Sequence, residues 1–168
     1  MIKFNTRLRG QGFSIPTLFL VVSLSHSTIL SAESTFKTIP AYCADASYPI
    51  IITVRGIRNS HGSIKAKLYG QNPDDFLVTG KKLDSKREST QIPSTVICLE
   101  APHPGTYAIV VHHDENGNKK LDQNWIGIPT EGVGFSNNPQ LFLAPPNHTE
   151  VAFPVIDELT TVDIDLQY

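Results

Sequence analysis

Four oxygen-bearing side chains follow an apolar stretch of the chain at short, regular intervals: Asp114, Asn116, Asn118 and Asp122. They take positions 1, 3, 5 and 9 of a calcium-binding loop, in which alternate side chains turn their oxygens onto one hard cation. Glu131 could add a further carboxylate from the segment that follows. The sequence therefore predicts a candidate Ca²⁺ site at residues 114–122.

Two positions of this loop depart from the calcium-binding pattern. The sixth position, usually Gly, is Lys119, and the twelfth, usually an acid that binds through both oxygens, is Trp125. A left-handed backbone at Lys119 would cost on the order of 1 kcal/mol. The same Asp and Asn residues also suit a tight turn in which short side chains hydrogen-bond the backbone. Both interpretations, an ion site and a hydrogen-bonded turn, follow from these residues.

Two neighbouring histidines, His112 and His113, precede the loop. Adjacent side chains of a strand point to opposite faces, so the pair is not expected to share a metal ion. Ser136 with His113 as its base would be a minimal nucleophilic pair, but His113 could equally bond the Asn-rich segment 136–138. The chain carries no nucleophile elbow, phosphate loop or zinc-protease motif, so no catalytic residue is assigned.

The elements that would hold these residues are predicted to be strands. Residues 106–113 are apolar on both faces, which is typical of a central strand. Residues 63–69 alternate strictly and, with the apolar run 49–56, are expected to form an antiparallel hairpin. Further strands are predicted at 95–100, 140–146, 150–156 and 160–167, with Pro154 indicating an edge or bulge. Residues 70–92 are expected to be a polar connection with one helical turn at 74–78, and residues 125–138 an extended loop.

These short strands and frequent turns predict an all-β fold. We expect an antiparallel Greek-key sandwich of about seven strands, of the immunoglobulin or transthyretin kind, with a small barrel as the alternative. The sandwich would span residues 49–168, after an extension, 33–48, that carries Cys43.

The first residues have the pattern of a secretory signal. Basic residues occur in the first nine positions, an apolar stretch covers 13–24, small residues continue to Ala32, and Glu33 is the first acid. The apolar stretch is shorter than the roughly 20 residues that span a bilayer. We therefore expect residues 1–32 to be a signal peptide and the mature chain to start near Glu33. A retained N-terminal anchor is the alternative.

Export bears on the two cysteines and on the charge. Cys43 and Cys98 are the only cysteines, so an oxidising compartment would pair them, and buried free thiols are the alternative.

The chain without residues 1–32 has 11 Lys and Arg and 16 Asp and Glu, which gives a net charge of −5. This charge argues against nucleic acid or an anionic membrane as a partner.

The segment 107–139 also resembles a known family. His113 to Asn118, Leu121-Asp122, Gly127-Ile128-Pro129, Glu131-Gly132 and Gly134 to Asn138 are similar to motifs of the bacterial exported proteins called domain of unknown function 2141. The resemblance extends over nearly the whole mature chain. It implies a bacterial source, export to the periplasm or beyond, and a β-sandwich, and it implies no activity.

Two classes of function remain. The first is an exported, non-enzymatic binding or structural module, possible partners being a small molecule, a glycan or a protein, with Ca²⁺ at the 114–122 loop. The second is a periplasmic hydrolase or another enzyme that uses residues 112–138. A deep pocket around His113, Asp122, Glu131 and Ser136 would favour the enzyme. Polar groups that pair among themselves would favour the module.

Overall fold

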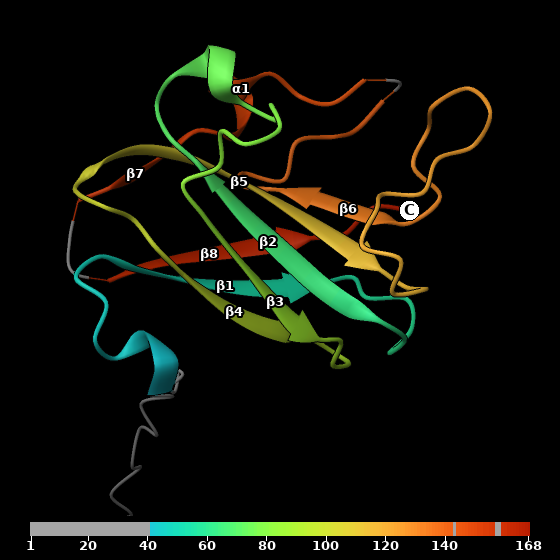
Figure 1. Cartoon of the computed structure of the whole chain (residues 1–168), viewed down its shortest axis with the longest axis horizontal. Helices are drawn as coiled ribbons and strands as arrows, with labels where there is room; N and C mark the ends of the chain where they lie inside the picture. Colours follow the sequence, from blue (N-terminus) through green and yellow to red (C-terminus); the bar gives the residue numbers. More distant parts are fainter. Residues whose placement is uncertain (1–40, 143, 157–158) are drawn as a thin grey trace, which may run out of the picture. The chain divides into compact units, whose positions relative to one another are not determined.

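The computed structural model of the chain describes residues 41–142, 144–156 and 159–168. The predicted signal peptide, 1–32, and residues 33–40 of the predicted extension lie outside this part. The described residues form eight strands and three short helical turns (Figure 1). The strands are β1 (Pro49–Arg55), β2 (Ser63–Tyr69), β3 (Asp84–Ser89), β4 (Thr95–Glu100), β5 (Gly105–Asp114), β6 (Gly132–Phe135), β7 (Phe153–Val155) and β8 (Thr160–Asp165). The turns are η1 (Ala41–Cys43), η2 (Pro73–Asp75) and α1 (His148–Val151).

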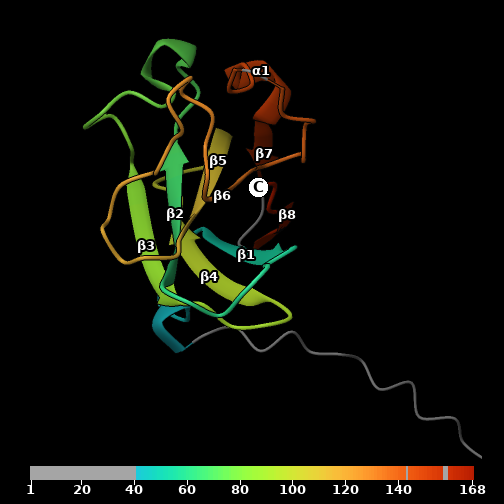
Figure 2. The same cartoon turned by 90° about the vertical axis from the view of Figure 1, so that its right-hand side faces the viewer.

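The strands form two sheets that lie as two layers (Figure 2). One sheet has the order β4-β1-β8, and the other has the order β3-β2-β5-β6, with β7 paired to the start of β5. The prediction of an all-β, two-sheet sandwich is confirmed, with eight strands in the described ranges and one parallel pair, β1 with β8. Within the same ranges, no helix has the length and apolar content needed to cross a bilayer.

The core lies between the two sheets and follows from the alternation of each strand. Ile50, Ile52 and Val54 of β1 face Ile64, Ala66 and Leu68 of β2, and none of these side chains is exposed. Burying one such Val, Ile or Leu side chain stabilises the fold by about 1.5–3 kcal/mol. β5 contributes Ile109 and Val111 to the same cluster, and it lies between β2 and β6, as its apolar sequence predicted.

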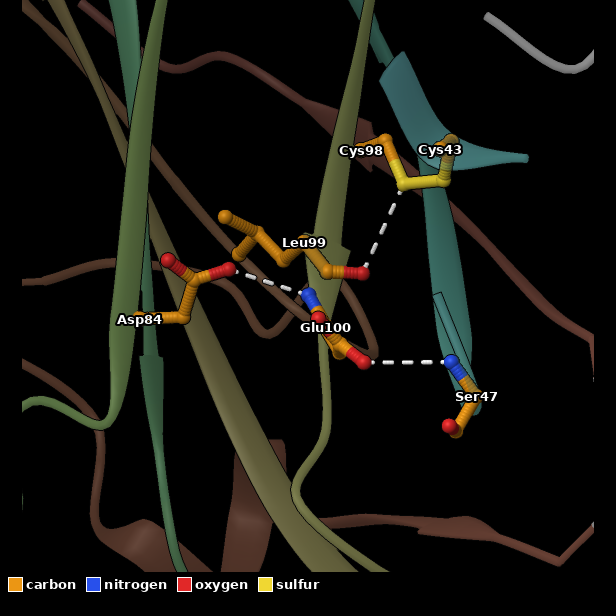
Figure 3. The surroundings of a disulfide bond; sticks show 6 residues. All are labelled: Cys43, Ser47, Asp84, Cys98, Leu99 and Glu100. Carbon is orange, nitrogen blue, oxygen red and sulfur yellow. Dashed lines mark hydrogen bonds between the residues drawn. A yellow bond between two sulfur atoms is a disulfide. The ribbon is translucent and has the colours of Figure 1, made fainter. Parts of the chain in front are cut away.

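The disulfide joins Cys43 of η1 to Cys98 of β4, as expected, and packs against Ile51 (Figure 3). Two hydrogen bonds lie beside it. The amide N–H of Ser47 donates to Oε1 of Glu100 over 3.1 Å, and the N–H of Glu100 donates to Oδ2 of Asp84 over 3.0 Å. These bonds tie the segment before β1 and the edge strand β3 to β4.

The predicted hairpin of 49–56 and 63–69 is wrong. β1 pairs with β4 and β8, whereas β2 pairs with β3 and β5 in the other sheet. The connection between them crosses from one sheet to the other, with Gly56 and Gly62 at φ +69° and +63°. An alternating pattern fixes which face is buried but not which strand lies alongside, and both segments bury a face in the shared core.

Two other expected strands are corrected as well. The described residues of 140–146 form no strand, and Phe142 is largely exposed. Only Phe153–Val155 of the expected strand 150–156 is extended, because His148–Val151 form a helical turn with a capping box between Asn147 and Glu150. Conversely, β3 lies in the expected polar connection and β6 in the expected extended loop. The helical turn expected at 74–78 is the shorter η2.

Candidate functional site

The chemistry-bearing residues of the motif lie at the end of β5, in the long connection from β5 to β6, and on β6 itself. The connection projects from the sheets as a loop in both overall views (Figures 1 and 2). β5 ends in His112, His113 and Asp114, whose side chains are all buried. The side chains of His112 and Asp114 lie on the outer face of the sheet and that of His113 lies on the inner face, because successive side chains of a strand point to opposite faces.

Glu131 closes the base of the loop. Its Oε2 lies 2.8 Å from Nε2 of His112 and accepts the amide N–H of Asp122 over 3.1 Å. Its Oε1 accepts the N–H of Glu115 over 2.9 Å. The carboxylate is 4% exposed, so it holds both ends of the loop from inside.

His113 has different partners on the inner side of the sheet. Its Nε2 lies 2.8 Å from the carbonyl oxygen of His61, and its Nδ1 lies 2.8 Å from the hydroxyl of Tyr168. A carbonyl only accepts, so Nε2 carries the proton and Nδ1 accepts from the phenol. The expected bond to the segment 136–138 is therefore wrong, since both nitrogens are taken by residues far away in the sequence.

Arg58 covers this inner group from the solvent side. Its guanidinium lies 4.3 Å from the ring centre of Tyr168 and donates to both oxygens of Glu115, over 2.6 and 3.2 Å. Asn59 donates to the same carboxylate. Burial would raise the pKa of the Glu115 carboxyl, but the bonds from Arg58 and Asn59 outweigh it and hold that pKa below its ordinary value.

Asp114, the first residue of the predicted calcium loop, is fully buried. Its Oδ2 accepts from Nη1 of Arg87 over 2.7 Å and from the amide of Lys119 over 2.9 Å. Burial opposes ionisation, yet these two bonds and the Arg87 charge keep the pKa of the Asp114 carboxyl below its ordinary value. The other oxygen, Oδ1, is buried and has no hydrogen-bond partner among the described residues.

The remaining loop residues bond one another at the surface. The side-chain amides of Asn116 and Asn118 donate to the two oxygens of Asp122, over 2.6 and 2.9 Å. Their own oxygens accept the amides of Asn118 and Lys120. Lys119 has φ +66°, the left-handed backbone that the sixth position of a calcium loop requires. The arrangement is thus a hydrogen-bonded turn with the backbone course of an ion loop.

Within the described ranges, no three side chains of His, Cys, Asp or Glu are grouped so that they could hold a metal ion. A cation here would depend on amide oxygens of Asn116 and Asn118 beside the two carboxylates of Asp114 and Asp122. Each amide oxygen already accepts one backbone N–H and would bind the ion through its second lone pair.

Ser136 lies after β6 and is fully buried. Its hydroxyl accepts the amide of Ile109 over 3.0 Å and donates to the carbonyl of Val151 over 2.5 Å. The next residues, Asn137 and Asn138, bond backbone carbonyls of the segment after β6 and of β8. This motif serine therefore joins β5 to α1, and its partners do not include His113.

The tip of the loop is a turn that sequence reasoning did not single out. Oδ1 of Asn124 accepts the amides of Ile126 and Ile128 over 3.1 and 2.9 Å, and Gly127 has φ +84°. The turn presents Trp125, whose surface is 94% exposed, beside the half-exposed Ile126. The signal available in the sequence was Asn at the first position of a four-residue turn that ends in Gly.

Comparison with known proteins places this geometry in a family. No curated protein and no solved structure matches the chain. The profile of a family described as an uncharacterized protein conserved in bacteria, domain of unknown function 2141, matches residues 52–163, which include every strand except part of β1 and the end of β8. The chain therefore belongs to the bacterial family of domain of unknown function 2141.

Proposed function

We propose that this chain is an exported, non-catalytic binding module that contacts its partner through the loop between β5 and β6. The observation that carries the proposal is the exposed Trp125 on an ordered turn. The Trp side chain has only two rotatable bonds, so it loses little conformational freedom on binding, and large aromatic residues dominate the binding energy of protein surfaces.

The buried motif residues support a binding role over a catalytic one. His113, Asp114 and Ser136 are fully enclosed, and their hydrogen bonds go to other parts of the fold. A general base must come within about 3 Å of the proton that it removes. These side chains would have to break structural bonds to reach a substrate. Together they form a support for the loop.

The disulfide and the N-terminal pattern support export. Cys43 and Cys98 pair, and disulfides persist in oxidising compartments such as the periplasm. Residues 1–32 have the order of a secretory signal.

Native mass spectrometry of protein purified from the envelope of its own bacterium tests the binding role. We expect wild type to carry a bound partner in a fixed ratio, and Trp125→Ala to lose it while its melting temperature stays within about 1 °C. Phe142→Ala is the matched control, since Phe142 is 82% exposed but lies outside the loop. Equal occupancy in wild type and Trp125→Ala would contradict the proposal.

We propose in addition that Ca²⁺ binds the 114–122 loop weakly. The observation in favour is the buried, unpartnered Oδ1 of Asp114 beside a turn whose sixth residue already has the required backbone. Buried acceptors without a donor cost about 1–3 kcal/mol, and an ion would remove that cost. Arg87 already balances the negative charge of Asp114, which weakens the attraction of this carboxylate for Ca²⁺. We therefore expect a Kd of about 10⁻⁴–10⁻³ M.

Thermal melts in 10 mM CaCl₂ against EDTA test this second proposal. This concentration is about ten to a hundred times the expected Kd, so Ca²⁺ would stabilise the native state by about 1.4–2.7 kcal/mol. Asp122→Asn should abolish the difference, whereas Asp45→Asn, an exposed acid remote in sequence, should retain it. Asp114 is the poorer choice because its loss also breaks the pair with Arg87. Identical wild-type melts in both buffers would leave the loop as a hydrogen-bonded turn.

A further inference from the structure

Over residues 63–67 of β2 and 85–89 of β3, the outer face carries cations and hydroxyl groups, and it ends at the buried ring of Tyr69. Cross-strand register places Ser63 opposite Ser89, Lys65 opposite Arg87, and Lys67 opposite Ser85. Residues directly opposite in an antiparallel pair share a face, and Ile64, Ala66 and Leu68 between them face the core. We call these six residues the donor face: Ser63, Lys65, Lys67, Ser85, Arg87 and Ser89.

The acids of β3 lie on the other side of the strand. Asp84 is opposite Leu68 and Glu88 is opposite Ile64, and both of these partners are core residues. Asp84 also accepts the amide of Glu100 on β4, in the facing sheet (Figure 3). The side of β3 that faces the second sheet thus carries two carboxylates and one lysine, Lys86, whereas the solvent side carries Arg87 between two serines and no acid.

Only one cation of the donor face is balanced within the fold. Arg87 pairs with the buried Asp114 and also donates to the hydroxyl of Ser63, so its guanidinium is fixed in place. In the described part of the chain, neither Lys65 nor Lys67 forms an ion pair, and the nearby Lys82 forms none either. The fold therefore concentrates unbalanced positive charge here although its net charge is negative.

The lysines also lie close enough to repel each other. Burial lowers the pKa of Lys67, and the charges of Lys65, Lys82 and Arg87 lower it further. Burial also lowers the pKa of Lys65, and the charges of Arg87 and Lys82 lower it further. The charge of Asp114 raises it. Both side chains are partly buried along their stems, which limits how far the ammonium groups can separate.

The spacing fits one small dianion. The Cα atoms of Lys65 and Lys67 are about 7 Å apart along β2, and the Cα atom of Arg87 on β3 is about 5 Å from that of Lys65. A phosphate oxygen accepts from an ammonium or guanidinium group over about 2.8 Å. Arg87 is held toward Ser63, on the side of Lys65 away from Lys67. A phosphate beside Lys65 would therefore be within reach of Arg87 and Lys65, and Lys67 would extend its side chain toward it. A phosphate monoester carries about −1.5 to −2 charges and three strong acceptor oxygens, which matches two unbalanced lysines and the neighbouring hydroxyls.

We propose that the donor face binds the phosphate monoester group of a soluble ligand. Arg87, oriented by Asp114 and Ser63, provides fixed donors, and Lys65 and Lys67 provide the charge that balances the phosphate. The hydroxyl of Ser85 lies opposite Lys67 and supplies a neutral donor. The binding groups lie on β2 and β3 and do not include Trp125, so the proposal on the loop can fail without affecting this one. Asp114 orients Arg87 and also belongs to the proposed Ca²⁺ site, so phosphate binding is measured in EDTA, without Ca²⁺.

Titration with inorganic phosphate at pH 7.5 and low, constant ionic strength, followed by backbone amide NMR shifts, tests the site. We expect saturable shifts confined mainly to residues 63–67 and 85–89. The double variant Lys65→Gln/Lys67→Gln should raise Kd by at least about tenfold, the loss of one or more charged contacts. The matched control, Lys86→Gln/Lys120→Gln, removes the same charge elsewhere and should change Kd less than about twofold.

Three results would overturn the proposal. Equal weakening in both double variants would show a response to net charge alone. Shifts centred outside β2 and β3 would place the anion elsewhere. Binding to vesicles of phosphatidic acid without binding to inorganic phosphate would replace the soluble ligand by a membrane. Lys67→Gln alone, checked by circular dichroism, serves as a second variant if the double variant unfolds.

Discussion

The end of β5 and the donor face carry similar side chains on one sheet but differ in how their charges are balanced. At the end of β5, Asp114 and Glu115 are paired with Arg87 and Arg58, Glu131 is hydrogen-bonded to His112, and the three acids are largely buried. On the donor face, Lys65 and Lys67 have no such partner in the described ranges. A charge balanced within the fold contributes to structure, whereas one left unbalanced near the surface is available to a ligand. The comparison thus separates the buried charges at the end of β5, which contribute to stability, from the lysines of the donor face, which we propose to be available to a ligand.

Arg87 belongs to both regions, so its removal should have the largest effect. Arg87→Gln would leave the buried carboxylate of Asp114 without a cation, and breaking a buried pair costs about 3–5 kcal/mol. Urea unfolding measures the loss. The control is Arg55→Gln, whose pair with Asp163 is about half exposed on both sides and should be worth about 0–1 kcal/mol. Equal losses in the two variants would show that Asp114 is not held by Arg87.

Lowering the pH should change the free energy of unfolding through the acids at the end of β5 and not through the lysines of the donor face. The pKa values of Asp114 and Glu115 are lowered in the folded state, so the stability that they contribute is present above their ordinary pKa and lost as the pH falls through the folded values. We expect the free energy of unfolding to fall steeply below about pH 4. Asp114→Asn should flatten this decline, whereas Lys67→Gln should leave its steepness unchanged. Urea unfolding at pH 2–6 gives the slopes.

The C-terminal tyrosine gives a smaller test of the inner network. Tyr168→Phe keeps the ring that fills the space above Gly132 but removes the donor to Nδ1 of the buried His113. An acceptor left without a donor costs about 1–3 kcal/mol, so we expect a loss near 1 kcal/mol. Thermal melts measure the loss, and nitrogen NMR shifts of His113 report its tautomer. Unchanged values for both would mean that the phenol is not the partner of His113.

The sequence predicted the strands that bury one regular face, and it missed those that do not. β2 and β8 were found because apolar residues alternate with polar ones over most of their length, and β5 was found because it is apolar on both faces. β3 was missed because all six of its residues are polar or charged, as expected for an edge strand with a donor face. β6 was missed because half of its residues are Gly. A Cβ on Gly134 would lie 2.6 Å from Ile164, so packing against β8 requires a residue without a side chain.

The candidate site was predictable in its residues but not in its partners. The local spacing from Asp114 to Asp122 suited both an ion site and a turn, and the hydrogen bonds among these residues are those of a turn. The left-handed backbone of Lys119 was considered from the sequence only as a possible strain. The groups that neutralise the motif come from distant segments, since Arg58 lies 57 residues before Glu115 and Arg87 lies 27 before Asp114. Such pairings depend on which strands become neighbours. The error on the hairpin of 49–56 and 63–69 has the same origin.

The smallest expected effect is that of Lys67, whose charge should slightly destabilise the folded state. Its pKa is lowered by burial and then by Lys65, Lys82 and Arg87, so the folded chain releases this proton more readily than the unfolded chain. Wild type should therefore gain stability as the pH rises toward 10.5, and Lys67→Gln should lack part of that gain while being more stable at pH 7 by up to about 0.5 kcal/mol. Burial raises the pKa of Tyr69, Tyr107 and Tyr168, which lowers the stability above pH 10 but equally in both proteins.

Melts from pH 7 to 10 compare wild type with Lys67→Gln, and Lys86→Gln, on the opposite side of β3, serves as the control. A lower stability of Lys67→Gln at pH 7 would mean that the lysine has a partner within the fold, and the donor face would then lose its unbalanced charge.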